Sequence, residues 1–332
     1  MSKRQLLTLT MTVRDEEAGL PRTLASVSGI VDEIVVADTG SSDRTIDIAR
    51  SLGAKVVEVP WEDSFAAARN RSLALATGDW VLILDPDEEF PPGEAQALRR
   101  LLESTPASAV SLLVETVGSL ENPRVPSFRA WRNRPDYRYR GRICELPDFG
   151  NDADEPGFLL YSSLRILHRG YEAANLVARD KLARNRQLLE LQYAETPDDP
   201  MILFFLARIA GDEGRDRDEE ELLRRAVEHD GRGAVPAATR NLANLLAFHG
   251  RLDEAWRVVA EGLSRFPEFA DLWFAKASLE NATGDLAAAA DSYRQTLALA
   301  QAPGGRYPET PQIAPAAASA LANLEAQPGA GL

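Results

Sequence analysis

The amino-acid sequence predicts an α/β domain followed by an all-α domain built from repeated helices. Over the first half of the chain, short β-rich runs alternate strictly with helical patterns. From about Asp180 onward, Leu, Ala, Glu and Arg recur at helical spacing, and a turn glycine returns after 36 and then 34 residues. We therefore expect domains at 1–178 and 179–326, with a disordered tail at 327–332.

Four strands and three helices are expected in the first part of the α/β domain. The strands are 6–13, 33–37, 55–59 and 80–84, and the helices are 18–28, 43–52 and 65–76. This alternation favours a mainly parallel sheet with helices on both faces. Ligands of such sheets bind beyond the carboxyl ends of the strands. Acidic and small polar residues gather at those places, in segments 14–17, 38–43 and 85–89.

The second domain shows a repeat with a period near 34 residues. Three glycines each end one helix and open a turn: Gly214, Gly250 and Gly284. Small residues stand where helices are expected to cross: Ala226, Ala255, Gly262 and Ala289. This is the tetratricopeptide pattern, although Glu219 and Thr296 occupy positions where the repeat prefers alanine. We expect three repeats, with capping helices at 181–193 and 314–324.

Composition narrows the classes of function. The net charge of −14 argues against broad nucleic-acid binding, which needs a basic surface. A single cysteine, Cys144, excludes an internal disulfide and a thiolate metal cluster. Because only three histidines occur, a metal site must consist mainly of carboxylates, which favours Mg²⁺ or Mn²⁺. No apolar run reaches the ~20 residues of a membrane helix, and residues 1–13 fit a buried strand better than a signal peptide. We expect a cytoplasmic protein without an integral membrane segment.

The segment DWVLILDPDEEF carries the most chemical information. An apolar strand runs directly into Asp85 and Asp87, which are one residue apart. Two carboxylates at a strand end can hold a divalent ion against a diphosphate. A D-x-D motif alone is common, and a solvated acidic loop is the plain alternative.

Two further segments place polar residues at the same edge of the sheet. In VVADTGSSDRT, Asp38 ends a strand, where its carboxylate can accept an N–H from a nucleobase. Asp43 is expected to be the N-cap of the next helix. In AAARN, Arg69 and Asn70 lie on a helix that faces the same rim.

The segments MTVRDEE, DTGSSDRT, AAARN and GDWVLILDPDEE, in this order and spacing, resemble family 2 glycosyltransferases of the GT-A fold. The resemblance covers about the first half of the chain and implies a Rossmann-like nucleotide-sugar domain. It places Thr12, Arg14 and Asp38 around the nucleotide base. It also places Glu16 near the sugar nucleotide.

The same resemblance divides the D-x-D motif into two roles. Asp85 would face the ribose or the metal, and Asp87 would bind the metal that bridges the diphosphate. Arg69 would assist the phosphates. Arg14-Asp15-Glu16 stands where lysine-asparagine-glutamate is more usual, and we expect this change to alter substrate contacts rather than abolish binding.

The later segments RYRGRICELP and RILHRGY resemble a subgroup of the family that carries tetratricopeptide repeats behind the transferase domain. That subgroup commonly reads G-R-x-H-E, so Cys144 stands in place of histidine and Glu145 is retained. The resemblance implies that Glu145 is the catalytic carboxylate and that His168 binds the metal. The plain alternatives are a core histidine at the end of strand 162–167, and a surface ion pair of Glu145 with Arg140 or Arg142.

These residues suggest a metal-dependent, inverting glycosyltransferase of the hexosyltransferase type. The donor would be a nucleoside diphosphate sugar, UDP-linked by preference, and the acceptor a saccharide, a lipid or a polypeptide. The repeats would bind a protein partner, present the acceptor or join two copies of the chain. A nucleotidyltransferase is disfavoured because TVRDEE lacks a glycine-rich loop. An adaptor with a degenerate transferase domain is the main alternative, and retention of the five residues Asp38, Asp85, Asp87, Glu145 and His168 argues against it.

Overall fold

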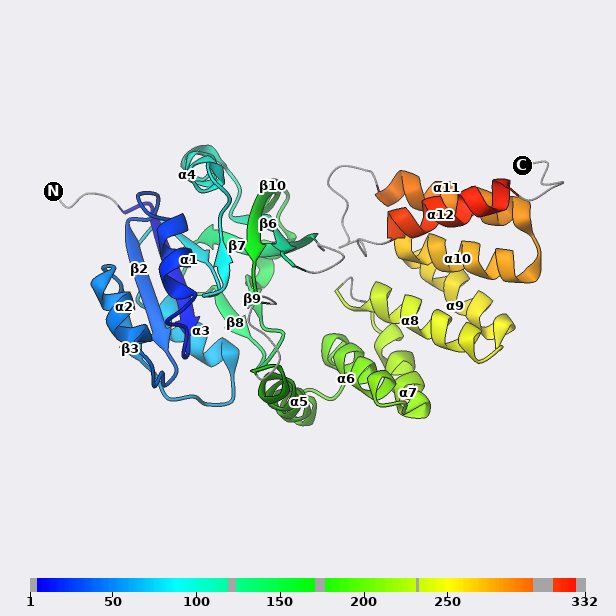
Figure 1. Cartoon of the computed structure of the whole chain (residues 1–332), viewed down its shortest axis with the longest axis horizontal. Coiled ribbons are helices and arrows are strands. Elements are labelled where there is room, and N and C mark those ends of the chain that lie inside the picture. Colours follow the sequence, from blue (N-terminus) through cyan, green and yellow to red (C-terminus); the bar gives the residue numbers. More distant parts are fainter. Residues whose placement is uncertain (1–4, 119–123, 171–176, 231–232, 301–312, 327–332) are drawn as a thin grey trace. The chain divides into compact units, whose positions relative to one another are not determined.

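The computed structural model describes residues 5–118, 124–170, 177–230, 233–300 and 313–326. The chain divides into two compact units, Met1–Leu188 and Leu189–Leu332. The first unit is α/β and the second is helical, which confirms the predicted fold class (Figure 1). The expected boundary after residue 178 falls inside helix α5 (Val177–Glu195), whose last residues belong to the second unit. The expected tail at 327–332 lies outside the described residues.

The first unit contains one large mixed sheet. Its first seven elements alternate as predicted: β1 (Leu7–Val13), α1 (Leu20–Ser26), β2 (Glu33–Asp38), α2 (Thr45–Ser51), β3 (Lys55–Glu58), α3 (Phe65–Leu73) and β4 (Trp80–Ile83). The following elements are β5 (Glu88–Glu89), α4 (Glu94–Ser104), β6 (Ala109–Thr116), β7 (Arg124–Arg132), β8 (Arg138–Arg140), β9 (Leu146–Asp148), the 3₁₀ turn η1 (Gly150–Asp154) and β10 (Leu159–His168). The strand order is β3-β2-β1-β4-β7-β6-β10-β5, with β7 antiparallel to both of its neighbours. A separate two-stranded hairpin joins β8 and β9.

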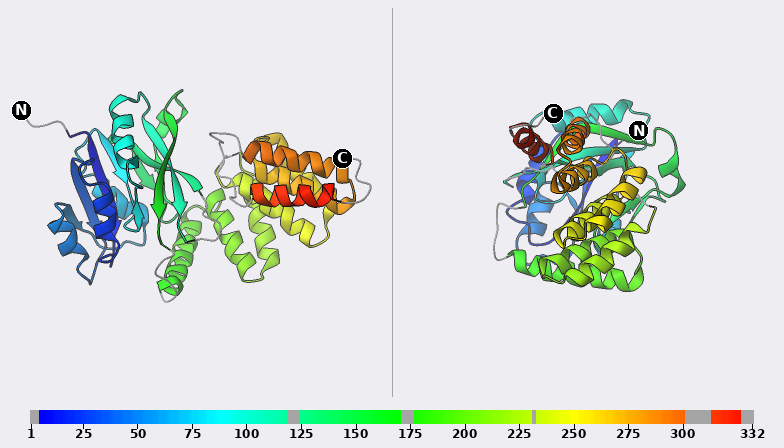
Figure 2. Two further views of the ribbon diagram at one scale, coloured as in Figure 1. Left: turned by 45° about the horizontal axis from the view of Figure 1, so that its top comes forward. Right: turned by 90° about the vertical axis from the view of Figure 1, so that its right-hand side faces the viewer.

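Each face of the large sheet has its own apolar core. Helices α1, α2 and α4 cover one face, where alternate residues of β1 and β4 are fully buried (Figures 1 and 2). Helix α3 covers the other face together with aromatic residues that follow β7: Tyr137, Tyr139, Phe149 and Phe158. Because side chains alternate along a strand, β4 serves both cores at once, with Trp80 and Leu82 in one and Val81 and Ile83 in the other. This burial holds the strand ends, and the loops that follow them, in fixed positions.

The carboxyl ends of β1, β2 and β4 meet at one edge of the sheet. These strands are parallel, and their register pairs Val13 with Asp38 and Thr10 with Ile83. We call this side of the sheet, formed by the carboxyl ends of these strands, the closing edge. The opposite side, formed by their amino ends and including the start of β2, is the opening edge. The polar segments singled out in the sequence therefore share the closing edge.

The second unit consists of paired helices. They are α6 (Pro200–Asp212), α7 (Asp216–Val227), α8 (Val235–Phe248), α9 (Leu252–Arg265), α10 (Ala270–Thr283), α11 (Leu286–Ala300) and α12 (Ile313–Glu325). The three turn glycines, Gly214, Gly250 and Gly284, have φ of 69°, 74° and 87°, a region that favours glycine. At Gly262 an added Cβ would lie 2.7 Å from Thr239, so the predicted close helix crossing is present.

The two departures from the repeat pattern are accommodated by their neighbours. Glu219 faces Gly211, where an added Cβ would lie 2.6 Å from the Glu219 carboxylate. Burial raises the pKa of Glu219. Thr296 is fully buried, and its hydroxyl donates to the Ser292 carbonyl. Across the described ranges of the chain, no helix is long and apolar enough to cross a membrane.

Candidate functional site

The D-x-D motif lies on a tight turn that returns the chain to the sheet. The Glu88 amide donates to the Asp85 carbonyl at 3.0 Å, which closes a four-residue turn with Pro86 at its second position. The Glu88 carboxylate accepts in return from the Asp85 amide at 2.9 Å. Strand β5 then pairs antiparallel with β10, with His168 opposite Glu88. The turn therefore delivers Asp87 to the end of β10.

Asp87 and His168, the two predicted metal ligands, are in contact. Their Oδ2 and Nε2 atoms are 3.2 Å apart, and both side chains are about 30% exposed. The bond to Asp87 raises the pKa of His168 against the opposing effect of partial burial. The Arg169 amide donates to the Asp87 carbonyl at 2.9 Å and fixes the backbone. His168 therefore lies against Asp87 at the end of β10, and its role as a metal ligand stays a prediction.

Gly170 approaches this pair closely, a feature that the sequence did not reveal. An added Cβ would lie 2.8 Å from both Asp87 Oδ2 and His168 Nε2. Within the described part of the chain, no cluster of three or more metal-ligating side chains occurs. One carboxylate and one imidazole in contact fit an Mg²⁺ or Mn²⁺ ion that takes its other ligands from phosphate and water.

Asp85 belongs to a chain of alternating charges rather than to the Asp87 pair. Arg69 donates from Nη2 to Asp85 at 2.8 Å and from Nε to Glu145 at 2.6 Å. On the other side, Arg129 Nη2 lies 2.5 Å from Glu88 Oε1, and its Nη1 lies 3.9 Å from Asp85 Oδ2. The order Glu145–Arg69–Asp85–Arg129–Glu88 joins three carboxylates through two guanidinium groups.

Burial and charge act in opposite directions on these carboxylates. Desolvation disfavours the ionised form of Asp85, but Arg69 and Arg129 outweigh it and lower its pKa to about 2. Glu88 is 1% exposed, and its burial, reinforced by the Asp85 charge, raises its pKa to about 7 despite Arg129. Both arginines have a raised pKa because, although burial opposes their charge, the neighbouring carboxylates stabilise it.

Glu145 reaches the site on the hairpin formed by β8 and β9. It lies in the five-residue connection 141–145, and Asn70 docks the hairpin onto α3 by bonding both the amide and the carbonyl of Tyr139 at 2.9 Å. The two polar residues of AAARN thus act together, since Arg69 holds the carboxylate and Asn70 holds the hairpin. The suggested surface partner Arg140 pairs with Asp148 instead.

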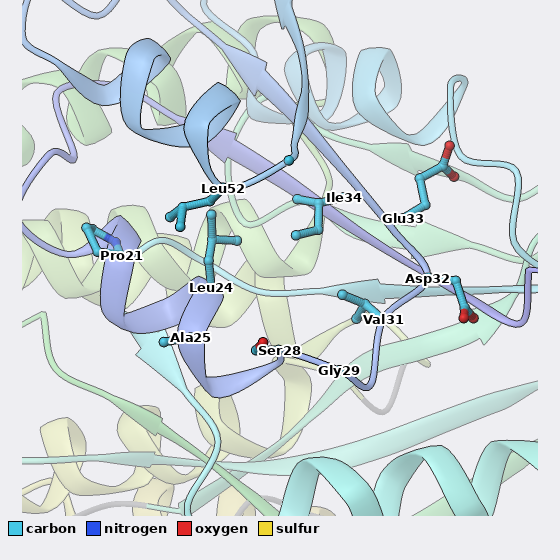
Figure 3. Close-up of a pocket in the computed structure, with 11 residues that line it drawn as sticks. Pro21, Leu24, Ala25, Ser28, Gly29, Val31, Asp32, Glu33, Ile34 and Leu52 are labelled. Carbon is cyan, nitrogen blue, oxygen red and sulfur yellow. The ribbon is translucent and has the colours of Figure 1, made fainter.

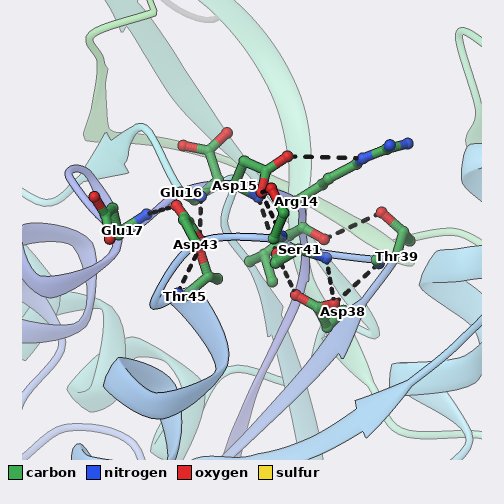
Figure 4. Close-up of polar contacts among 12 residues, drawn as sticks. Arg14, Asp15, Glu16, Glu17, Asp38, Thr39, Ser41, Asp43 and Thr45 are labelled. Carbon is green, nitrogen blue, oxygen red and sulfur yellow. Dashed lines mark hydrogen bonds and ion pairs between the residues drawn. The ribbon is translucent and has the colours of Figure 1, made fainter.

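The last residue of β2, Asp38, is the predicted base-binding residue. Asp38 is 1% exposed, and its Oδ1 accepts from the amides of Gly40 and Ser41 at 2.9 Å each (Figure 4). The Ser41 hydroxyl bonds its other oxygen. At the end of β1, the buried Thr12 Oγ1 has no hydrogen-bond partner. A buried hydroxyl without a partner is costly, and a nucleotide at this edge would relieve that cost.

The loop after β1 is bonded to the loop after β2 (Figure 4). Asp15 has φ of 53°, a region that Asp and Asn tolerate better than most residues, and its carboxylate accepts from the Ser42 amide at 2.7 Å. The replacement of the usual asparagine thus keeps the backbone conformation. The Glu16 amide donates to Thr45 at 2.7 Å, and the Arg14 side chain is 56% exposed.

Asp43 was expected to be the N-cap of α2, but that position belongs to Arg44. Its carboxylate still accepts from the first amide of the helix, that of Thr45, and from the Glu17 amide. Asp43 therefore has a structural role in joining the two loops.

A cavity of about 440 Å³ lies elsewhere, between α1, α2 and the start of β2 (Figure 3). Of its two carboxylates, Asp32 accepts from the amides of Leu6 and Leu7, and Glu33 accepts from Thr8. It lies at the opening edge, away from Asp38 and Asp87, and its acidic residues already have structural partners.

Two regions of the chain match known families. Residues 8–158 match the family model "Glycosyl transferase family 2", and residues 236–279 match a tetratricopeptide repeat. A TPR repeat-containing protein of Synechococcus elongatus is 35% identical over 300 residues, which cover 88% of this chain and 66% of that protein. The SPbeta prophage-derived glycosyltransferase SunS of Bacillus subtilis is 25% identical over 230 residues, which cover 67% of this chain and 53% of SunS.

Glucosyl-3-phosphoglycerate synthase from Mycobacterium tuberculosis, solved in complex with Mn²⁺, uridine diphosphate and glucosyl-3-phosphoglycerate, aligns with a TM-score of 0.42 at 21% identity. The alignment covers 57% of this chain and 79% of the synthase. The chain spans between about half and two thirds of the length of the two curated relatives named above. Residues 8–158 are a family 2 glycosyltransferase domain, joined in one chain to tetratricopeptide repeats.

Proposed function

We propose that the chain is an inverting, metal-dependent glycosyltransferase that uses a nucleoside diphosphate sugar, UDP-linked by preference. The observation that carries this proposal is the convergence of Asp87 and His168 within a family 2 domain, where the side-chain-free Gly170 approaches both. Two protein ligands leave a cation free to bind a diphosphate as well. Bound there, Mg²⁺ or Mn²⁺ would stabilise negative charge on the leaving diphosphate.

The donor would lie along the closing edge of the sheet. Asp38 and the unpartnered hydroxyl of Thr12 are suited to the nucleoside, because both stand at the ends of adjacent parallel strands. The exposed Arg14 and the carboxylate of Glu16 would border the sugar nucleotide. Asp85, fixed by Arg69, would face the ribose.

Glu145 is proposed as the general base. Arg69 binds its Oε1 and holds the carboxylate in place, which leaves Oε2 to take the proton of the acceptor hydroxyl. The acceptor oxygen attacks the anomeric carbon from the face opposite the diphosphate. The new C–O bond forms as the bond to the diphosphate breaks, and the sugar passes through an oxocarbenium-like state with inversion. Arg69 thus acts through Asp85 and Glu145, and its predicted contact with the phosphates remains part of the proposal.

The test is release of nucleoside diphosphate from a panel of nucleotide sugars, with and without Mn²⁺. Wild type should hydrolyse at least one donor in a metal-dependent manner, and Asp87→Ala should lose this activity. The exposed aspartate of α2, Asp47, provides a matched control as Asp47→Ala. A fully active Asp87→Ala enzyme would contradict the metal assignment.

Glu145→Gln separates binding from transfer. The variant should bind uridine diphosphate as wild type does and lose transfer to the acceptor, because the amide cannot take a proton. Retention of both properties would mean that another residue is the base.

The adaptor remains the second candidate, because a stack of helical repeats generally offers a surface for a protein segment. It predicts no binding of uridine diphosphate with or without Mn²⁺. In the enzyme, the same repeats would present the acceptor, whether saccharide, lipid or polypeptide, or join two copies of the chain.

A further inference from the structure

Strand β7 contains an irregularity next to the site. Its pairing with β6 runs from Val110 and Ala130 to Ser111 and Phe128, so Arg129 has no opposite residue. Such a β-bulge changes the direction of a side chain, and bulges are over-represented next to active sites. The burial pattern agrees, because Phe128 and Trp131 pack in the same core while Ala130 packs in the other. The bulge therefore interrupts the alternation of β7 at Arg129.

The redirected side chain of Arg129 reaches the D-x-D turn. It is 13% exposed, and its Nη2 lies 2.5 Å from Glu88 Oε1. Glu88 accepts the Asp85 amide through its other oxygen, at 2.9 Å. One guanidinium thus fixes the carboxylate that closes the turn, and its Nη1 also lies 3.9 Å from the Asp85 carboxylate.

The position of the Asp87 side chain depends on the turn as a whole. The residue lies between Asp85 and Glu88, and its carboxylate projects to His168. A shift of the turn would separate the two groups, although the Arg169 amide also donates to the Asp87 carbonyl and β5 pairs with the end of β10. The geometry of the pair therefore depends on the bonds at both ends of the turn.

We propose that Arg129 is a positioning residue of this site, which holds the Asp85–Glu88 turn through Glu88 so that Asp87 faces His168. The structural part of this inference stands on the contacts alone. Its consequence for the cation rests on the proposed function.

The experiment compares four variants with wild type. Arg129→Met removes both contacts, and Arg129→Lys keeps one charge without the two-pronged geometry of a guanidinium. Because Arg129→Met leaves Glu88 buried without its partner, the double variant Arg129→Met/Glu88→Gln removes both charges and protects folding. The control is Arg132→Met, on the same strand, where the guanidinium stacks on Trp80 at 4.2 Å and lies outside the site.

Two readouts are needed, each at a temperature where every variant is folded. Hydrogen exchange of the amides of Asp85 and Glu88 should be about tenfold faster in the double variant, with the amides of β4 unchanged. Mn²⁺ affinity in the presence of uridine diphosphate should fall about 10–100-fold, the range found when an outer partner of a metal ligand is removed. Arg129→Lys should recover part of both effects, and Arg132→Met should show neither.

A folded double variant with wild-type exchange at the turn would overturn the proposal, as would normal exchange in Arg129→Met. If the wild type binds no Mn²⁺ with any nucleoside diphosphate, the proposed function fails, and the exchange measurement alone still decides the role of Arg129. Equal loss of Mn²⁺ affinity in Arg132→Met would show a general effect of weakened β7 and would also overturn the inference.

Discussion

The sheet of the first unit carries an acidic cluster at each of its two edges, and the two clusters are built differently. At the opening edge, Glu33 accepts from the Thr8 hydroxyl at 2.7 Å and the Thr77 amide at 2.8 Å, and pairs with Lys55. At the closing edge, Glu88 is more deeply buried and depends on Arg129 and one amide. Burial opposes ionisation in both, yet the pKa of Glu33 is lowered whereas that of Glu88 is raised to about 7.

The difference shows how a structural carboxylate can be told from one in a binding site. At the opening edge each carboxylate has amide or hydroxyl donors and a cation, Lys55 for Glu33 and Arg99 for Asp32, so the cluster is complete without a ligand. Of the described buried polar atoms that lack a partner, Thr12 Oγ1 and Arg129 Nε lie at the closing edge, and Trp80 Nε1 lies at the start of β4. Like charges also crowd the closing edge, around Asp85. A charged ligand can bond the unpartnered donors of the closing edge and offset its surplus charge.

The largest effect should come from a single methyl group at the closing edge. Gly170→Ala places a Cβ 2.8 Å from both Asp87 Oδ2 and His168 Nε2, so the two proposed ligands of the cation must shift. We expect metal-dependent donor hydrolysis to fall about 10³-fold, or ~4 kcal/mol in transition-state stabilisation. Steady-state kinetics across a Mn²⁺ titration measures this loss.

Thermal unfolding provides the control for that variant. Gly170 lies in a turn, is exposed and has no φ that requires glycine, so the free energy of unfolding should change little. Wild-type activity in Gly170→Ala would contradict the placement of the cation between these two ligands.

The second prediction concerns the opening edge, where a mutation should lower stability and leave ligand affinity unchanged. Glu33→Ala leaves the Thr8 hydroxyl and the Thr77 amide without their acceptor, and we expect the free energy of unfolding to fall by about 2–3 kcal/mol. Affinity for uridine diphosphate and Mn²⁺ should stay at the wild-type value in the folded protein. Urea denaturation and a binding titration check the two parts, and lost binding in folded Glu33→Ala would remove the distinction between the edges.

The pH dependence of the same residue gives a smaller effect. Because the hydroxyl and amide donors and Lys55 lower the pKa of Glu33 below 4.5 against the effect of burial, its charged form contributes stability above the unfolded value. That contribution is lost as the pH falls through the folded pKa. The difference in unfolding free energy between wild type and Glu33→Gln should therefore be constant near neutral pH and shrink below about pH 4. An unchanged difference at pH 3 would mean that the charge of Glu33 contributes nothing.

The features that could be predicted from the sequence are those that depend on the local pattern of residues. The alternation of elements placed Asp38, Asp85 and Asp87 at one edge, and the resemblance added His168 and Glu145. The roles of Arg129 and Gly170 depend on contacts across 41 and 83 residues of chain, from Arg129 to Glu88 and from Gly170 to Asp87. A bulge has no clear sequence signal in SFRAW, and a glycine after a strand is usually a turn residue. Partners of Arg69 could not be assigned for the same reason, since only the folded hairpin brings Glu145 to α3.

The smallest effect tests whether a glycine facing a carboxylate is always functional. Gly211 in the repeats faces Glu219 as Gly170 faces Asp87, with an added Cβ 2.6 Å from Glu219 Oε2. Here the neighbour is the end of a flexible side chain, so Gly211→Ala should be nearly neutral, because the gain in helix propensity of up to ~1 kcal/mol offsets the displacement. In a Glu219→Ala background the same change should stabilise by about 0.5–1 kcal/mol. A double-mutant cycle by urea denaturation measures this coupling, and strict additivity would show that the two residues do not contact each other.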